Sequence, residues 1–109
     1  MKRAALYARV STELQKDEQT IQNQLSEIRR AVNADGCVLI EDCIYQDDGW
    51  SGALLERPDL DRLRQDAKNE KFDIVYVYDR GRLARKFVYQ EIIIEELTKH
   101  GVEFKMLVS

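Results

Sequence analysis

The stretch Phe72-Asp73-Ile74-Val75-Tyr76-Val77-Tyr78 decides the fold of this chain. It is rich in β-branched and aromatic residues, which favour strands, and residues 74–78 contain no charged side chain. A continuous apolar run of this length is typical of a strand that lies inside a parallel sheet with both faces covered. The stretch therefore predicts a buried strand of an α/β protein.

The sequence before this stretch predicts two more strands with a helix between them. Residues 4–10 and residues 37–46 are strand-like. Between them, Asp17 and Glu18 open a helical pattern that the dipeptide Asp35-Gly36 ends. The pattern is one apolar stripe with four-, three- and four-residue spacing, made by Ile21, Leu25, Ile28 and Val32.

Two further helices and a last strand are predicted on either side of the central stretch. Pro58 stands at the favoured first position of one helix. Residues 87–99 form another helical pattern, which His100 and Gly101 close, and residues 102–108 are strand-like. Strand and helix alternate throughout, which predicts an α/β fold with a mostly parallel sheet of about four strands and helices on both faces. The expected buried faces are Leu60, Leu63 and Ala67 in the first helix, and Val88, Ile92, Ile93 and Leu97 in the second.

The composition is that of one folded domain. At 109 residues the chain is long enough for a single core, its hydrophobic fraction of 44% is ordinary, and its charged residues (34%) are mixed with apolar ones. No apolar run approaches the roughly 18 residues of a membrane span, and residues 1–3 lead into a strand rather than a signal peptide. We therefore expect a cytoplasmic domain with no membrane partner.

The net charge of −3 argues against a nucleic-acid partner only as an average. Lys and Arg total 17 against 20 Asp and Glu, but the charges are unevenly distributed. Residues 1–10 carry +3 and residues 79–86 carry +3, which leaves −9 on the remainder. The sequence therefore predicts a basic site built from two separate segments.

The cysteines and the single histidine favour neither a metal site nor a catalytic triad. Cys37 and Cys43 are six residues apart in a predicted strand, about 20 Å, whereas a disulfide needs Cα atoms within about 7 Å. No histidine lies near them in sequence to complete a metal site. His100 precedes Gly101 at a predicted helix end, where a cation suits the helix dipole, so catalysis by histidine is not expected. We expect no cofactor and no metal.

A hydroxyl and several arginines follow two of the predicted strands. Arg9 and Ser11 lie at the end of the first strand, and residues 79–86 follow the central one. If these strands are neighbours, their carboxyl ends share the edge of the sheet where ligands of α/β proteins bind. Arginine matches phosphate oxygens with a planar fork, and no glycine-rich nucleotide loop follows a strand, so the set favours attack of Ser11 on a phosphodiester. The arginines of the second segment are Arg80, Arg82 and Arg85.

Five blocks of sequence resemble the serine recombinases, the family of resolvases, invertases and large integrases. The first, Tyr7-Ala8-Arg9-Val10-Ser11-Thr12, resembles the signature around the nucleophilic serine of that family. The D-x-G-x-S-G loop and the R-P pair are most similar to the large or transposon-type branch. The four further blocks, in the family's order and spacing, are Thr20-Ile21-Gln22-Asn23-Gln24, Asp47-Asp48-Gly49-Trp50-Ser51-Gly52, Arg57-Pro58 and Arg82-Leu83-Ala84-Arg85.

The resemblance implies a resolvase-like catalytic domain and a DNA strand-exchange activity. Ser11 would attack a phosphodiester of double-stranded DNA and form a 5′-phosphoserine link, leaving a free 3′ hydroxyl, with neither ATP nor a metal. Family members bind as dimers, synapse as tetramers, exchange strands and reseal them. The implied catalytic residues are Ser11, Arg9, Arg57, Arg82 and Arg85, with Tyr7, Gln24 and Asp47 in support.

The chain departs from the family pattern at two places. The family usually has an aspartate directly before the first arginine of R-L-x-R, where this chain has Gly81. Asp79, two residues earlier, could supply a carboxylate if the segment is reshaped, which a glycine permits. Family members also continue into a dimer-forming helix and DNA-binding domains. We therefore expect residues 1–109 to be a catalytic domain without these parts, with weak DNA binding and little recombination by itself.

Other interpretations of the residues stay open. Gly81 would suit a catalytically silent recombinase-like module that serves assembly. The arginines would also suit a flavodoxin-like or receiver-like domain that binds a small phosphorylated ligand, or a phosphatase that uses Ser11 on small esters. Trp50 is expected to pack on the domain, and residues 87–99 are more apolar than one sheet face requires, which would suit a subunit interface.

Overall fold

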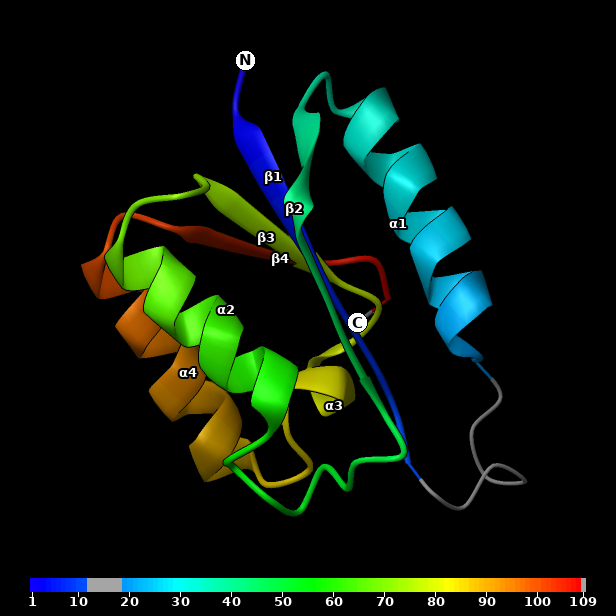
Figure 1. Ribbon diagram of the computed structural model, residues 1–109, viewed down its shortest axis with the longest axis vertical. Helices are drawn as coiled ribbons and strands as arrows, with labels where there is room; N and C mark the ends of the chain where they lie inside the picture. Colours follow the sequence, from blue (N-terminus) through cyan, green and yellow to red (C-terminus); the bar gives the residue numbers. More distant parts are fainter. Residues whose placement is uncertain (12–18, 109) are drawn as a thin grey trace.

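Four strands form one parallel sheet in the order β2-β1-β3-β4 (Figure 1). The structure is a computed structural model that describes residues 1–11 and 19–108. The strands are β1 (Arg3–Val10), β2 (Val38–Asp48), β3 (Ile74–Val77) and β4 (Glu103–Met106). The predicted mostly parallel sheet of about four strands is therefore confirmed, and β1 and β3 are neighbours.

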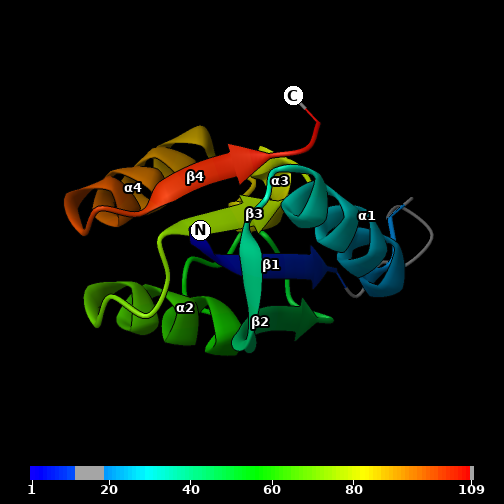
Figure 2. The ribbon, with the colours of Figure 1, turned by 90° about the horizontal axis from the view of Figure 1, so that it is seen from above.

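The helices lie on both faces of the sheet, as predicted. They are α1 (Ile21–Ala34), α2 (Pro58–Lys68), the single turn α3 (Arg80–Leu83) and α4 (Phe87–Lys99). Figures 1 and 2 show α1 on one side of the sheet and α2 with α4 on the other. None of the helices in the described part of the chain is long and apolar enough to cross a bilayer.

The central strand β1 divides the apolar core into two halves. Ala4, Leu6 and Ala8 are buried in a cluster with residues of α1, while Ala5 and Tyr7 are buried in a cluster with residues of α2 and α4. Successive side chains of a strand point to opposite faces, so a strand covered on both faces must be apolar throughout. This explains why the side chains of residues 4–8 carry no polar group except the Tyr7 hydroxyl. Tyr7 lies on the face of the sheet that α2 and α4 cover.

The predicted buried faces of the first two helices are confirmed. Ile28 and Val32 are buried in α1, with Ile21 and Leu25 packed against the same cluster. In α2 the whole predicted face, Leu60, Leu63 and Ala67, is buried.

The start of α1 is set by a side-chain cap. Thr20 accepts a hydrogen bond from the backbone N–H of Asn23 at 3.1 Å, so the helix begins at Ile21. Asp17 and Glu18, predicted to open this helix, lie outside the described residues, as does Thr12 of the first motif.

Helix α4 has a narrower buried face than its sequence predicts. Ile93 and Leu97 are buried, but Val88 and Ile92 are 58% and 42% exposed, so their predicted burial is wrong. The reason is the place of α4, which packs beside α2 and over the edge strand β4 rather than over the middle of the sheet. One stripe of the helix is covered, and its remaining apolar residues face solvent.

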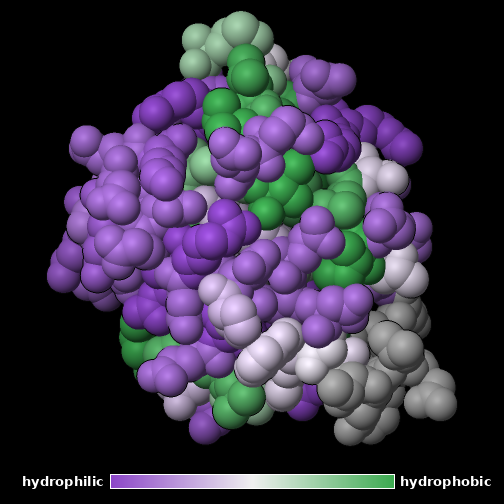
Figure 3. Space-filling model, viewed as in Figure 1, coloured by the Kyte–Doolittle hydropathy of each residue, from purple (hydrophilic) through white to green (hydrophobic). Residues whose placement is uncertain are grey.

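The connections after the strands also differ from the predictions. Residues 79–86, expected as a loop, contain the turn α3, and β2 continues to Asp48 because Asp47 and Asp48 pair with the end of β1. Trp50, expected to pack, is 38% exposed. Figure 3 shows a mostly hydrophilic face with apolar atoms gathered in its upper middle part.

Candidate active site

Ser11 lies directly after β1, at the edge of the sheet where the strands end. The segment after β2 is fastened to the same place, because the backbone N–H groups of Gly49 and Trp50 both donate to the carbonyl of Val10, at 2.9 and 3.2 Å. Gly49 has a φ of +80°, a conformation that favours glycine. Ser11 itself is only 7% exposed. The predicted nucleophile therefore lies at the carboxyl edge of the sheet, next to the segment that follows β2.

Arg9 joins three segments at this edge through its guanidinium group. It donates to the carbonyls of Gly81 at 2.8 Å, Arg82 at 3.1 Å and Trp50 at 3.0 Å, and it is 5% exposed. Two of these carbonyls belong to α3 and the third to the segment after β2. Because a buried guanidinium needs acceptors for its N–H groups, Arg9 holds α3 and that segment against the end of β1.

Arg82 returns the contact from α3. Its Nη1 donates to the carbonyl of Arg9 at 3.1 Å, and it is 9% exposed. Its Nε lies 3.8 Å from a carboxylate oxygen of Asp79, three residues earlier on the same turn. The structure thus places Arg9 and Arg82 in contact at the end of β1, next to Ser11 in the chain.

Gln24 ties helix α1 to the backbone next to Ser11. Its side-chain oxygen accepts from the N–H of Arg9 at 3.2 Å, and its amide nitrogen donates to the carbonyls of Arg9 and Gln19 at 3.0 and 3.1 Å. The side chain is fully buried. Gln24 therefore supports the arginine cluster by fixing the backbone of residue 9, two positions before the serine.

Asp47 caps helix α2 from a neighbouring strand. Its two carboxylate oxygens accept from the backbone N–H groups of Asp59 and Leu60, each at 3.0 Å. Arg57, at the N-cap position, makes no side-chain cap hydrogen bond of its own. A carboxylate at this end of a helix also faces the positive end of the helix dipole. Asp47 therefore fixes the position where α2 begins, and with it the position of the N-cap residue Arg57.

Tyr7 connects Asp47 to Arg57. The Tyr7 hydroxyl donates to Asp47 at 2.7 Å and accepts from Nη1 of Arg57 at 2.9 Å. Burial raises the pKa of Tyr7 far above its usual value, against the opposing effect of the Arg57 charge, so the hydroxyl keeps its proton. Asp47 is thus linked to Arg57 through the Tyr7 hydroxyl and through the start of α2, while its predicted supporting role stays a prediction.

Arg57 is the largest fully buried side chain of the described residues, 1% exposed. Besides Tyr7 it donates to the carbonyls of Arg82, at 3.1 Å, and of Leu83. Its observed contacts are all with the protein, and they hold the last residues of α3. The prediction that Arg57 also meets a phosphate stays a prediction.

Arg85 lies at the rim of the site and is exposed. Its backbone N–H donates to the carbonyl of Gly52 at 2.9 Å. A Cβ on Gly52 would lie 2.8 Å from Nη2 of Arg9 and 3.0 Å from Cγ of Arg85. Gly52 is thus a site residue absent from the predicted set, and its signal was the closing glycine of the D-x-G-x-S-G block.

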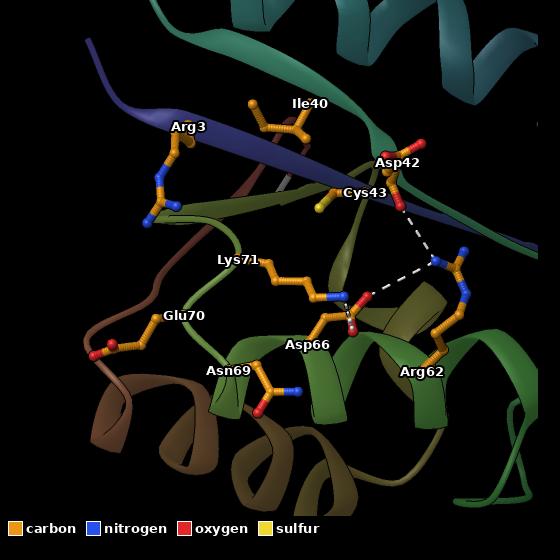
Figure 4. A pocket seen from close by; sticks show the side chains of 9 residues that line it. All are labelled: Arg3, Ile40, Asp42, Cys43, Arg62, Asp66, Asn69, Glu70 and Lys71. Atoms are coloured by element: carbon orange, nitrogen blue, oxygen red, sulfur yellow. Dashed lines mark hydrogen bonds and ion pairs between the residues drawn. The ribbon is translucent and has the colours of Figure 1, made fainter.

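A hollow of about 770 Å³ lies elsewhere (Figure 4). It is lined by the start of β1, the middle of β2 and the second half of α2, near the edge where the strands begin. Several of its charged side chains are paired, as in the contacts of Asp66 with Arg62 and Lys71 at 3.8 and 3.4 Å. It contains none of the predicted site residues. No cluster of three or more His, Cys, Asp or Glu side chains suited to a metal ion occurs among residues 1–11 and 19–108.

Known proteins have similar sequences. The model of the Resolvase, N terminal domain family matches residues 4–109. The "Putative DNA recombinase" of Bacillus subtilis is 43% identical over 101 residues, which cover 90% of this chain and 19% of that protein. The "Probable DNA-invertase y4cG" of Sinorhizobium fredii is 39% identical over 101 residues, which cover 93% of this chain and 28% of that protein. The chain thus spans less than a third of the length of these curated relatives.

Solved structures agree with the sequence matches. The N-terminal catalytic domain of TP901-1 integrase superposes with a TM-score of 0.87 at 34% identity, covering 97% of this chain and 77% of that one. The C-terminal catalytic domain of ISC1926 TnpA, an IS607-like serine recombinase, gives a TM-score of 0.83 at 27% identity, covering 96% and 70%. With the family model matched over nearly its whole length, this chain belongs to the resolvase N-terminal domain family, the catalytic domains of the serine recombinases.

Proposed function

We propose that this chain cuts and rejoins double-stranded DNA through a covalent bond between Ser11 and a DNA phosphate. The observation that carries the proposal is the place of Ser11, two residues after Arg9 and at an edge where Arg9 and Arg82 bind each other's backbone. Guanidinium groups placed beforehand at a reacting phosphate stabilise the charge that builds on its oxygens. Membership of the serine recombinase family supports the same chemistry.

In the proposed reaction the Ser11 oxygen attacks the phosphorus. A bond forms between that oxygen and phosphorus, and the bond from phosphorus to the 3′ oxygen breaks. The serine loses its hydroxyl proton and the 3′ oxygen gains one, so the products are a 5′-phosphoserine link and a 3′ hydroxyl. Because one phosphate ester replaces another, rejoining to a new 3′ hydroxyl needs no external energy source.

The arginines would differ in how they reach the phosphate. We assign phosphate contact to the exposed Arg85, and to Arg9 and Arg82, which are 5% and 9% exposed and would exchange bonds to carbonyls for bonds to the phosphate. Arg57 is held by Tyr7 and by carbonyls of α3, so a phosphate contact from Arg57 would require those bonds to break. In the arrangement described, Arg57 keeps α3, and therefore Arg82, in place.

The test is a search for the covalent intermediate. The full-length protein is incubated with a pool of duplex fragments from the source genome, quenched with detergent, and examined for DNA that stays attached to protein. We expect an adduct whose phosphopeptide maps to Ser11 and which Ser11→Ala abolishes. An established serine recombinase with a duplex of its own site added to the pool serves as the positive control. No adduct from this protein in a pool where the control forms one would reject the proposal.

Two further measurements distinguish the other functions from the proposed one. A silent assembly module would give no adduct but would keep its association with other subunits in Ser11→Ala. A phosphatase would hydrolyse a chromogenic phosphate monoester in a Ser11-dependent way. We expect neither result.

The chain is proposed to act as the catalytic part of a longer recombinase. Its relatives of 39% and 43% identity are several times longer than the matched segment. In that setting DNA recognition, dimer formation and synapsis would depend on other domains, and residues 1–109 would contribute the cutting and rejoining chemistry.

A further inference from the structure

We propose that Asp79 is a positioning residue for Arg82, and that Gly81 is the residue that leaves room for its carboxylate. The inference rests on the proposed function, because Arg82 is one of the arginines assigned to the DNA phosphate. It assigns a role to the departure of this sequence from the family pattern at position 81. Asp79 and Gly81 are treated as one device.

The carboxylate of Asp79 does not cap α3, although Asp79 stands at the N-cap position of that turn. Asp79 is the N-cap residue of α3, with an extended backbone (φ −148°, ψ 170°). Aspartate at an N-cap ordinarily accepts a hydrogen bond from a backbone N–H of the first turn. Here it makes no such side-chain cap hydrogen bond. One carboxylate oxygen instead lies 3.8 Å from Nε of Arg82.

The other carboxylate oxygen occupies the space beside Gly81. A Cβ built on Gly81 would lie 3.1 Å from that oxygen, closer than such atoms usually approach. The φ of Gly81 is not in the left-handed region, so a side chain there is opposed by Asp79 and not by the backbone. An aspartate at position 81 would also bring a second negative charge against the first. A carboxylate at position 81 would therefore displace and repel the one at position 79, and glycine avoids both effects.

Arg82 is the residue that benefits. It is 9% exposed, and its Nη1 is committed to the carbonyl of Arg9. A buried guanidinium is stable only when opposite charge and acceptors surround it. The Asp79 carboxylate lies 3.8 Å from Nε, so the guanidinium lies between a carboxylate and the carbonyl of Arg9. The plane that would meet a phosphate is thereby fixed before DNA arrives.

Relocation of the carboxylate is the decisive test. We expect Asp79→Ala to lower the rate of adduct formation about tenfold, a typical effect of losing a charged contact that orients a reacting group. The double variant Asp79→Ala with Gly81→Asp returns a carboxylate to the same turn without the clash, so we expect it to recover most of the rate. Gly81→Asp alone, which sets two carboxylates against each other, should be slower than the wild type. The substrate is the duplex captured in the genomic pool.

Stability measurements separate positioning from folding. Urea unfolding of every variant shows whether the fold is kept, and Asp79→Asn, which preserves size but not charge, should lose rate without a matching loss of stability. Equal rates for Asp79→Ala and the wild type would overturn the proposal. So would a double variant that folds but is no faster than Asp79→Ala.

A second readout does not depend on DNA cleavage. In the 109-residue chain, the Nε–H resonance of Arg82, assigned by its loss in Arg82→Lys, should shift in Asp79→Asn, because that variant removes the neighbouring negative charge. A shift without any Ser11 adduct would reject the proposed function and leave the Asp79–Arg82 pair standing. An adduct without such a shift would do the reverse.

Discussion

At the scale of single residues, the site depends on a glycine that leaves room for an arginine. A Cβ on Gly52 would lie only 2.8 Å from Nη2 of the Arg9 guanidinium. The nearest atom belongs to the end of a flexible side chain. A larger residue at position 52 would therefore displace the Arg9 guanidinium at a lower free-energy cost than it would unfold the domain.

Gly52→Ala is therefore predicted to lower activity through Arg9. Displacing Arg9 breaks its bonds to Trp50 and Gly81, so we expect adduct formation to fall at least about tenfold and the free energy of unfolding to fall by about 1 to 3 kcal/mol. Urea unfolding and the adduct assay measure the two effects.

Gly36→Ala is the matched control for Gly52→Ala. Gly36 has a φ of +71° and open space around it, so an alanine there should cost about 1 kcal/mol of stability without changing the adduct rate. If Gly52→Ala kept its full rate, the close approach would have no functional meaning.

A second residue-scale prediction concerns Tyr7. Its hydroxyl links Arg57 to Asp47, and Tyr7→Phe would remove an acceptor from a guanidinium that is 1% exposed. We expect a loss of about 1 to 3 kcal/mol in the free energy of unfolding, the usual cost of a buried polar group left without its partner. Tyr89→Phe, on the outer part of α4, should change stability by less than about 0.5 kcal/mol. Equal effects of the two variants would show that the Tyr7 hydroxyl contributes nothing beyond its ring.

At the scale of elements, the ends of strands and helices are tied by side chains from other elements. Asp47 of β2 caps α2, and we predict that Asp47→Ala costs about 1 to 2 kcal/mol or more, since it removes the cap and an acceptor of the buried Tyr7. Asp48→Ala is the matched control, because the neighbouring side chain is exposed and should matter by less than about 0.5 kcal/mol. Equal losses in urea unfolding would contradict the capping role.

Asp73 ties the start of β1 to the segment before β3, and its effect should depend on pH. It accepts from the backbone N–H of Arg3 at 2.9 Å and from the Arg3 guanidinium, which lower the pKa of its carboxyl from 3.8 to about 2. The folded pKa lies below the unfolded one, so the stabilisation is complete above about pH 4 and is lost as pH falls towards 2.

Asp73→Asn should reveal this window. Because the pair is more than one-third exposed, we expect a difference from the wild type of at most about 1 kcal/mol at pH 6, and none near pH 2. Urea unfolding at both pH values measures it. A difference that persisted unchanged at pH 2 would show that the carboxylate charge is not its cause.

The elements were predictable from the sequence where periodicity decides them, and not where a tertiary contact does. The apolar stripe ending in Val32 and the proline at position 58 gave α1 and α2 correctly. The turn α3 escaped prediction because four residues with a glycine and two arginines carry no apolar period. The sequence motifs predicted a site that contains Ser11 and several arginines. They did not predict that the Arg57 side chain is buried, because arginine is normally exposed. Its burial depends on tertiary contacts with Tyr7 and two carbonyls.

At the scale of the whole molecule, the parallel fold places Ser11 at one edge of the sheet. All four strands end at this edge, which also carries α3 and the exposed Arg85 and Lys86. The helices return in the opposite direction, so Lys68 and Lys99 at the ends of α2 and α4 lie toward the edge where the strands begin. Basic side chains thus lie at both edges, and DNA cut by Ser11 would contact those of the first.

This arrangement predicts weak DNA binding that is sensitive to salt and to position. We expect the 109-residue chain to bind duplex DNA with a dissociation constant no tighter than about 10⁻⁶ M at physiological salt, the range of sequence-independent contacts. Arg85→Ala and Lys86→Ala should each reduce the dependence of log K on log salt by about one, because each removes one phosphate contact. Lys68→Ala and Lys99→Ala remove the same charge from the opposite edge and should leave that slope unchanged, as fluorescence anisotropy across a salt series would measure. If all four variants behaved alike, DNA would be responding to net charge, and the edge that carries Ser11 would have no special part in binding.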